Sequence, residues 1–379
     1  MILEFSLKNY FSFKEVARIS FRVNENCPDE FKSSHGTVHL MGIKGANGSG
    51  KTNILRAIRF VGIFCARSFL GEPDGKIGVK QFFSSKKPSE FSVEFLCGNI
   101  QYQYDLKVDN DRVHYESLHR KLKRKTKLFE RINDELTYTT EGFSSLKAIK
   151  LRSNSSIIST AHNHKLELMD EIYYYFACWN GNVTYKGLSE IGPSIYKIAE
   201  ELNDNPEDLN FIKEFIVQCD GGVSDIAIRK VEREDGESVY VPVFIHESAG
   251  RANRVSHVTE SSGTKSLFKY LLHYRNALQC GGLLILDEFD INLHPHILPK
   301  LLALFSDSET NPYDAQMVFS THNGEILDQL GRYRCYLVNK EDNESFAYRL
   351  DEIPGETLRN DRSITHAYNR GDIGGVPRI

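Results

Sequence analysis

Residues 45–52, GANGSGKT, have the spacing G-x-x-x-x-G-K-[ST] of a loop that binds phosphate groups. An apolar stretch precedes this loop and a helical pattern follows it, which is the context the motif requires. Its glycines let backbone N–H groups point at phosphate oxygens, and the start of the helix adds its dipole. The alternative is a glycine-rich turn that happens to contain a lysine. The predicted nucleotide ligands are Asn47, Gly48, Ser49, Gly50, Lys51, Thr52 and Asn53.

An acidic pair far along the chain fits the same chemistry. The apolar run 283–286 ends in Asp287 and Glu288 and predicts a strand buried on both faces. Acids are also favoured in the first turn of a helix, which is the alternative reading. Beside a phosphate loop, Lys51 would reach the β- and γ-phosphates, while Thr52 and Asp287 would hold Mg²⁺. Glu288 would then act as general base toward the attacking water.

Two further elements could complete such a site. His322 follows another apolar strand and could hold the γ-phosphate and water in line, although a histidine there can also be purely structural. The small residues 261–264 precede a helix, where they could form an ordinary N-terminal cap. They also suit a second phosphate-binding surface. Because the first loop already surrounds the phosphates from one side, Ser261 and Gly263 are expected to reach them from another subunit.

The surrounding pattern predicts an α/β protein. Alternating residues at 3–7 and 19–23 indicate a strand pair, and residues 90–118 indicate a β-meander. Residues 165–218 have a helical pattern, including the whole of 165–179, and a β-hairpin follows them. Strands and helices then alternate, which implies a mixed or parallel central sheet. We therefore predict an N-terminal lobe at 1–150, a compact helical insertion with a hairpin at 151–250, and a C-terminal lobe at 251–379.

Composition limits the class of protein. Hydrophobic residues make up 40% and charged residues 26% of the 379 residues, which is ordinary for a globular protein. The net charge of −4 argues against a nucleic-acid footprint over the whole surface. The start of the chain is no signal peptide, and no apolar run approaches the roughly 18 residues of a membrane span. The seven cysteines are scattered singly, as expected for small buried side chains in a reducing cytoplasm. We expect a cytoplasmic protein with no membrane partner.

The order of the motifs resembles that of the ABC-type ATPases, in particular the RecF/SMC/OLD branch and its bacterial RloA/AbiLi-like AAA ATPases. GANGSGKTN is similar to Walker A, VTESSGTKSL to the signature, LLILDEFDINLHP to Walker B with the D-loop, and FSTHN to the H-loop. LEFSLKNYFSF and AYNRGDIGGVP, near the two ends, also resemble this group. The resemblance implies an ABC-type P-loop ATPase head with an antiparallel β-subdomain. It also implies ATP and Mg²⁺ as cofactors and a homodimer or higher oligomer that closes around ATP.

Two functions remain open at this stage. The resemblance suggests a switch in bacterial defence against phage, which controls a separately encoded effector: a nuclease or toxin, for example a Toprim nuclease of the RloB kind. Only residues 323–379 follow His322, and we expect them to form closing strands rather than a nuclease domain. The alternative is a RecF-like DNA-binding ATPase of DNA repair, favoured by the basic run HRKLKRKTK at 119–127. That run could equally be a solvated face. A transporter ATPase fits less well, because its motifs would lie closer together.

Overall fold

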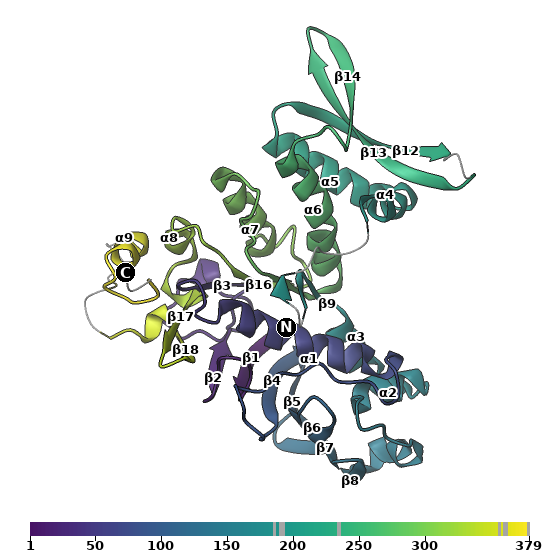
Figure 1. Cartoon of the computed structure of the whole chain (residues 1–379), viewed down its shortest axis with the longest axis vertical. Helices are drawn as coiled ribbons and strands as arrows, with labels where there is room; N and C mark the ends of the chain where they lie inside the picture. The colour runs from purple at the N-terminus through teal and green to yellow at the C-terminus, as the bar shows by residue number, and fades with distance from the viewer. Residues whose placement is uncertain (185–186, 189–193, 233–235, 355–357, 359–362, 377–379) are drawn as a thin grey trace.

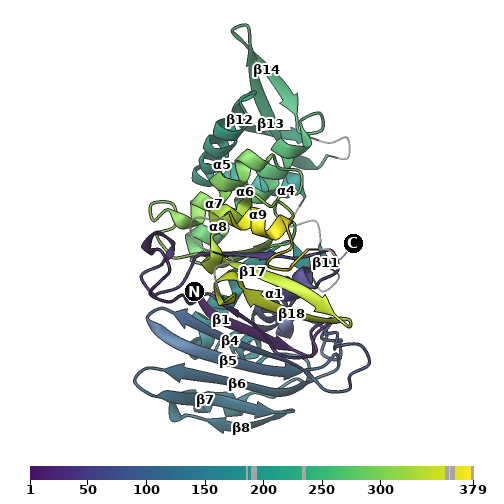
Figure 2. The same ribbon diagram turned by 90° about the vertical axis from the view of Figure 1, so that its left-hand side faces the viewer.

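Helix α1 (Lys51–Arg67) lies between two β-sheets, and a group of helices covers the far face of one of them (Figures 1 and 2). The computed structural model describes residues 1–184, 187–188, 194–232, 236–354, 358 and 363–376. Among the described helices, none has the length and apolar character needed to cross a lipid bilayer.

The central sheet has six strands in the order β18-β17-β3-β16-β15-β9, and only β18 runs antiparallel to its neighbour. Its strands are β3 (Leu40–Lys44), β9 (Trp179–Gly181), β15 (Leu283–Leu286), β16 (Gln316–Ser320), β17 (Cys335–Glu341) and β18 (Glu344–Arg349). Successive residues of β15 enter different cores: Leu283 and Ile285 pack on one face, Leu284 and Leu286 on the other. The acidic pair therefore follows a strand buried on both faces, as predicted.

The two cores on either side of this sheet are built from different elements. On one side α1 packs with α2 (Ile157–Asn163), α3 (Asp170–Ala177) and a second sheet. On the other side lie α6 (Ser262–Cys280), α7 (Leu298–Ser306), α8 (Ile326–Leu330) and α9 (Ile364–Asn369). The mixed α/β architecture predicted from the alternating pattern is confirmed.

The second sheet is antiparallel, with strand order β2-β1-β4-β5-β6-β7-β8. Its strands are β1 (Ile2–Lys8), β2 (Ala17–Ser20), β4 (Ser89–Cys97), β5 (Ile100–Val108), β6 (Val113–Lys121), β7 (Lys125–Ile132) and β8 (Glu135–Thr139). Buried and half-buried residues alternate strictly along β4, as expected for a sheet with one face on a core. The meander predicted over 90–118 continues for two more strands.

A three-stranded sheet projects from the helical side of the molecule (Figure 1). It contains β12 (Val223–Glu232), β13 (Ser238–Ser248) and β14 (Arg251–Ser256), and it adjoins α4 (Ile195–Asp204) and α5 (Pro206–Cys219). The boundary predicted at residue 250, after the helical insertion and hairpin, lies in the turn between β13 and β14. The division into three segments stays a prediction.

One predicted helix is shorter than expected. The apolar pattern over 165–179 suggested a continuous helix, but α3 ends at Ala177 and Trp179 begins β9. Residues 179–181 pair in parallel with 283–285, so the chain leaves the helix to add an edge strand beside β15. Two two-residue strands follow, β10 (Val183–Thr184) and β11 (Gly187–Leu188). Long-range pairing overrides the local helical pattern here.

Candidate functional site

The phosphate loop joins β3 to α1 and is held in shape by residues from distant strands. Gly50 caps the helix with a φ of 115°, a conformation that favours glycine. A β-carbon at this position would lie 2.7 Å from Ser345 Oγ and 2.9 Å from Ser12 Oγ. The Ser345 hydroxyl donates a hydrogen bond to the carbonyl of Ser49. Strand β18 therefore packs against the loop, and only glycine fits at position 50 between them.

Lys51 lies at the mouth of this loop. Its Nζ donates hydrogen bonds to the carbonyls of Gly45, at 2.8 Å, and Ala46, at 3.1 Å. Burial lowers the pKa of Lys51, and the negative charges of Asp287 and Glu288 act in the opposite direction. A buried ammonium group bonded only to carbonyls gains much from an anion, so this position favours a phosphate group.

The acidic pair meets the loop at the carboxyl edge of the sheet. The Thr52 hydroxyl donates a 2.7 Å hydrogen bond to Asp287, whose side chain is almost fully buried. The Ser320 hydroxyl donates to the same carboxylate and accepts a 2.8 Å hydrogen bond from the N–H of Glu288. Asn182 bonds both the N–H of Asp287, at 2.6 Å, and its carbonyl, at 2.8 Å. Sheet and side chains together fix the backbone of the acidic pair.

These residues fit a Mg²⁺–nucleotide complex. The Thr52 hydroxyl and the Asp287 carboxylate are adjacent oxygen ligands, the type that Mg²⁺ prefers. The Ser49 hydroxyl is buried and has no partner among the described residues. A β-carbon added to Gly48 would meet no atom within 4 Å, so an anion can approach the backbone there. A cavity of about 550 Å³, within the size range of ligand sites, adjoins residues 46–49 and is also lined by residues 339–341 and by Gly371 and residues 374–376.

Glu288 and His322 form the outer part of the site. Glu288 has a φ of 49°, in a region that non-glycine residues rarely adopt, at the turn that follows β15. Its Oε1 lies 3.7 Å from His322 Nε2, and the two side chains are 40% and 48% exposed, respectively. The Lys44 ammonium donates a 2.9 Å hydrogen bond to the His322 carbonyl, and Asp290 accepts one from its N–H. His322 is thus placed to orient a group beside Glu288.

The turn at 261–264 is positioned separately from the phosphate loop. The Ser261 hydroxyl caps α6 by accepting a 3.1 Å hydrogen bond from the N–H of Thr264, so the capping role is observed. The Thr264 hydroxyl donates in turn to Asp220. A β-carbon on Gly263 would lie 3.3 Å from the carbonyl of Asn292, in the loop after the acidic pair. Ser261 is exposed, which leaves this turn accessible from outside the chain.

One predicted phosphate ligand has a different environment. The amide of Asn53 donates a 2.9 Å hydrogen bond to Ser12 Oγ, and its oxygen accepts one from Arg56. Asn53 therefore ties α1 to the segment after β1. The predicted ligand Asn47, by contrast, lines the cavity beside the loop.

Several positioning residues were not predicted from the sequence. Ser320 could have been noticed, because it is a polar residue at the end of an apolar strand, two residues before His322. Ser12 lies in the family-like stretch LEFSLKNYFSF, but nothing in that stretch indicates a contact with Ser345 or Asn53. Asn182, Ser345 and Lys44 belong to no motif, although Lys44 directly precedes the loop.

Comparison with known families gives one result for this chain. A family model described as "AAA domain, putative AbiEii toxin, Type IV TA system" matches residues 40–328. The matched stretch begins with β3 and contains the phosphate loop, the turn at 261–264, the acidic pair and His322. A comparison with curated proteins gives no match.

We predict that Asn182→Ala destabilises the protein because two buried backbone groups of Asp287 lose their partner. An unsatisfied buried donor or acceptor costs about 1–3 kcal/mol, so the free energy of unfolding should fall by about that amount. The measurement is urea unfolding followed by circular dichroism. Asn203→Ala, at an exposed position on α4, is the control and should leave the midpoint unchanged. Equal midpoints for both variants would contradict the assigned role of Asn182.

Proposed function

This chain belongs to that AAA-domain family of P-loop ATPases. From this membership we propose that it binds ATP with Mg²⁺ and hydrolyses the bond between the β- and γ-phosphates. The observation that carries the proposal is the 2.7 Å hydrogen bond between Thr52 and Asp287. An incidental glycine-rich turn does not explain why residues of two separate motifs are hydrogen bonded to each other. Mg²⁺–nucleotide binding requires both of them.

Each polar side chain then has a role in the reaction. Lys51 neutralises the β- and γ-phosphates, and the loop amides hold their oxygens. Thr52 and Asp287 would hold Mg²⁺, which would offset the negative charge of the phosphate groups. Glu288 accepts the proton of the attacking water, and His322 beside it keeps that water in line with the phosphate. Because Asn182, Ser320 and Lys44 fix the backbone around these residues, little reorganisation is needed at the reacting atoms.

We predict that Lys51→Ala removes ATP binding, because the phosphates lose the only side-chain cation assigned to them. Glu288→Gln should retain binding but lower the turnover rate by about 10²-fold or more, because an amide cannot accept the proton of water. Binding is measured by calorimetry and turnover by phosphate release. Glu325→Gln, at an exposed position, is the control and should behave as wild type. Wild-type turnover in Glu288→Gln would mean that another group is the base.

We further propose that two identical chains close around two ATP molecules, with Ser261 and Gly263 of one chain facing Lys51 of the other. Three observations support this arrangement. Ser261 and Ser262 are exposed, the hydroxyl of Thr264 donates to Asp220, and a 19-residue helix begins at Ser262, where the dipole of the helix favours an anion. Closed two-fold symmetry would make both composite sites equivalent.

Mixing two inactive variants tests the paired arrangement. A dimer of one Lys51→Ala chain and one Ser261→Arg chain keeps one intact composite site and carries both defects in the other. ATP turnover should therefore partly return on mixing, although each variant alone is inactive. Subunit exchange is verified with differently tagged chains. If exchanged dimers stay inactive at every mixing ratio, the two motifs do not act across subunits.

We propose that this ATPase is the switch of a bacterial anti-phage system of the RloA/OLD kind, and that a separately encoded effector, a nuclease or toxin, reads its state. The family description names a toxin and a type IV TA system, which supports a role in such conflicts. ATP-driven closure supplies a two-state element, and a switch also needs a partner that distinguishes the two states.

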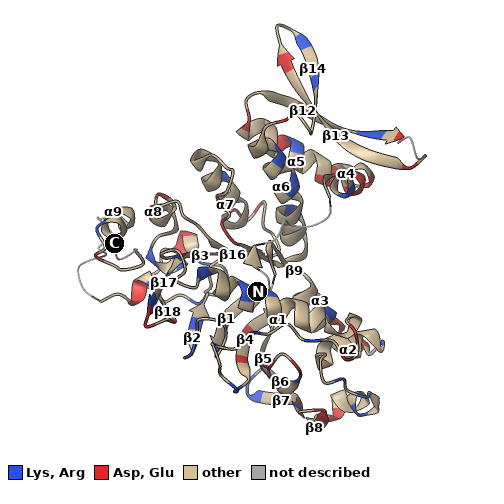
Figure 3. Ribbon diagram, viewed as in Figure 1, with Lys and Arg blue, Asp and Glu red and all other residues tan. Residues whose placement is uncertain are grey.

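The RecF-like alternative is favoured by one observation. Residues 121–126, at the tip of the β6–β7 hairpin, are all exposed and include four cations: Lys121, Lys123, Arg124 and Lys125. Elsewhere, basic and acidic residues are interspersed over the ribbon rather than gathered on one face (Figure 3). Lys127, in β7 close to this tip, is already paired with Glu130. The hairpin tip could contact DNA locally.

One experiment separates the effector model from these alternatives. The purified chain is incubated with plasmid, single-stranded DNA and RNA in the presence of ATP and Mg²⁺ or Mn²⁺. We expect no cleavage, because the proposed effector is a separate protein, and only weak binding that falls steeply with salt. Cleavage that co-purifies with the chain and survives Glu288→Gln would reveal a nuclease site within it. Tight DNA binding that weakens with salt and is lost when Lys123 and Arg124 are changed to Glu would favour the repair function.

A further inference from the structure

Two cysteines far apart in the sequence meet at the edge of the central sheet opposite to the phosphate loop. Cys178 directly precedes β9, and Cys280 is the last residue of α6, separated from β15 by two glycines. The parallel pairing of Trp179 with Leu283 brings the starts of both strands together. A β-carbon added to Gly282 would lie 3.1 Å from both Cys178 Cβ and Cys280 Sγ. Both side chains therefore contact the same glycine.

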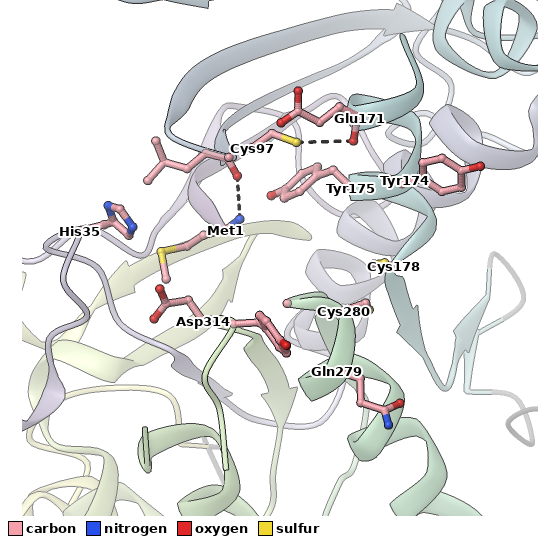
Figure 4. Close-up of a pocket in the computed structure, with 14 residues that line it drawn as sticks. Met1, His35, Cys97, Glu171, Tyr174, Tyr175, Cys178, Gln279, Cys280 and Asp314 are labelled. Carbon is pink, nitrogen blue, oxygen red and sulfur yellow. Dashed lines mark hydrogen bonds between the residues drawn. The ribbon is translucent and has the colours of Figure 1, made fainter. Parts of the chain in front are cut away.

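The two thiols lie beside the same cavity. Their side chains both approach Gly282, and Figure 4 shows them close together at the edge of this cavity. The cavity has a volume of about 450 Å³ and is also lined by Met1, Cys97 and Tyr175. Cys280 is exposed and Cys178 half-buried, so a small oxidant can reach the pair. Most other cysteines, such as Cys65 and Cys335, are fully buried.

The chemical environment makes one thiol of the pair reactive. The neighbouring Cys280 thiol lowers the pKa of Cys178 to about 7, and the proximity of Cys178 raises the pKa of Cys280. Cys97, in the same cavity, differs: burial and the nearby charge of Glu171 raise its pKa to about 12. Since the thiolate is the nucleophile, Cys178 is expected to react before Cys97.

We infer that Cys178 and Cys280 form a reversible disulfide when a peroxide oxidises the protein, and that this bond fixes the end of α6 to the start of β9. The Cys178 thiolate attacks one oxygen of hydrogen peroxide and becomes a sulfenic acid, while the released hydroxide takes up the thiol proton as water. The sulfur of Cys280 then displaces the sulfenic hydroxyl, which leaves with the Cys280 proton as a second water. Two thiols are oxidised, and one peroxide is reduced to two waters.

The bond would affect the nucleotide site through both elements that it joins. Helix α6 carries Ser261 and Gly263 at its other end, and β9 leads directly into Asn182, which holds the backbone of Asp287. A covalent link at the far end of α6 restricts any rotation of this helix relative to the sheet. This consequence rests on the proposed function, whereas formation of the disulfide does not.

The test treats the reduced protein with a small excess of hydrogen peroxide. We expect the intact mass to fall by two hydrogen atoms, two thiols to become unreactive to maleimide, and a peptide joining Cys178 to Cys280 to appear after digestion. Dithiothreitol should reverse all three changes. Cys280→Ser should instead give a dimedone-reactive sulfenic acid at Cys178, and Cys97→Ser, the matched control in the same cavity, should cross-link normally. A bond to Cys97, a bond between chains, or an oxidised Cys178 that never cross-links in the wild type would overturn the assignment.

A second measurement addresses the consequence for activity. Phosphate release from ATP should be lower in the cross-linked protein and should recover with dithiothreitol, while Cys280→Ser should be insensitive to peroxide. Equal rates for the reduced and cross-linked wild-type protein would overturn the regulatory effect. If the reduced protein shows no ATP turnover, the proposed function fails, whereas the mass measurement still decides the disulfide.

Discussion

The hydrogen bond between Thr52 and Asp287 depends on strand register, and the rest of the site depends on that register too. These residues are separated by 235 positions in the chain, yet their side chains meet because β3, β16 and β15 are neighbours and run parallel. Parallel strands bring their carboxyl ends to one edge of a sheet, so whatever follows each strand is collected there. The phosphate loop, the acidic pair and His322 each follow one of these three strands. A shift of one residue in the pairing of β15 with β16 would turn the acids toward the opposite face.

Burial of charge is the second constraint on this region. Asp287 is buried, and Lys51 is nearly so, yet they are not bonded to each other. Asp287 is stabilised by hydroxyl groups, and Lys51 by carbonyl groups, so neutral dipoles take the place of a direct ion pair. Such an arrangement keeps the cation and the carboxylate apart. A ligand that carries both signs, as a metal–phosphate complex does, would complement the two separate charges.

Much of this could be predicted from the sequence, and the parts that could not share one cause. The phosphate loop and the acidic pair are local signals, because each directly follows the apolar residues of its strand in the sequence. The antiparallel sheet was predicted in part, because alternation is visible strand by strand. By contrast, the local sequence pattern assigns the three residues of β9 to a helix. Asn182 reaches the backbone of Asp287 only because β9 pairs with β15. The contacts of Ser12 and Ser345 with the loop, and of Cys178 with Cys280, likewise join segments with no pattern in common. Local periodicity carries no information about such pairs.

The projecting β12–β14 sheet has a mechanical consequence. It adjoins α4 and α5, which pack in turn against α6, so the sheet and the helix that begins at Ser262 belong to one packed unit. The displacement of a point in a rotating rigid body grows with its distance from the axis. The outer ends of β13 and β14 are far from the central sheet (Figure 1), so they would travel farthest for a given tilt of α6. A small tilt of α6 would therefore become a larger displacement at the outer end of the β12–β14 sheet, where it could change how another molecule fits.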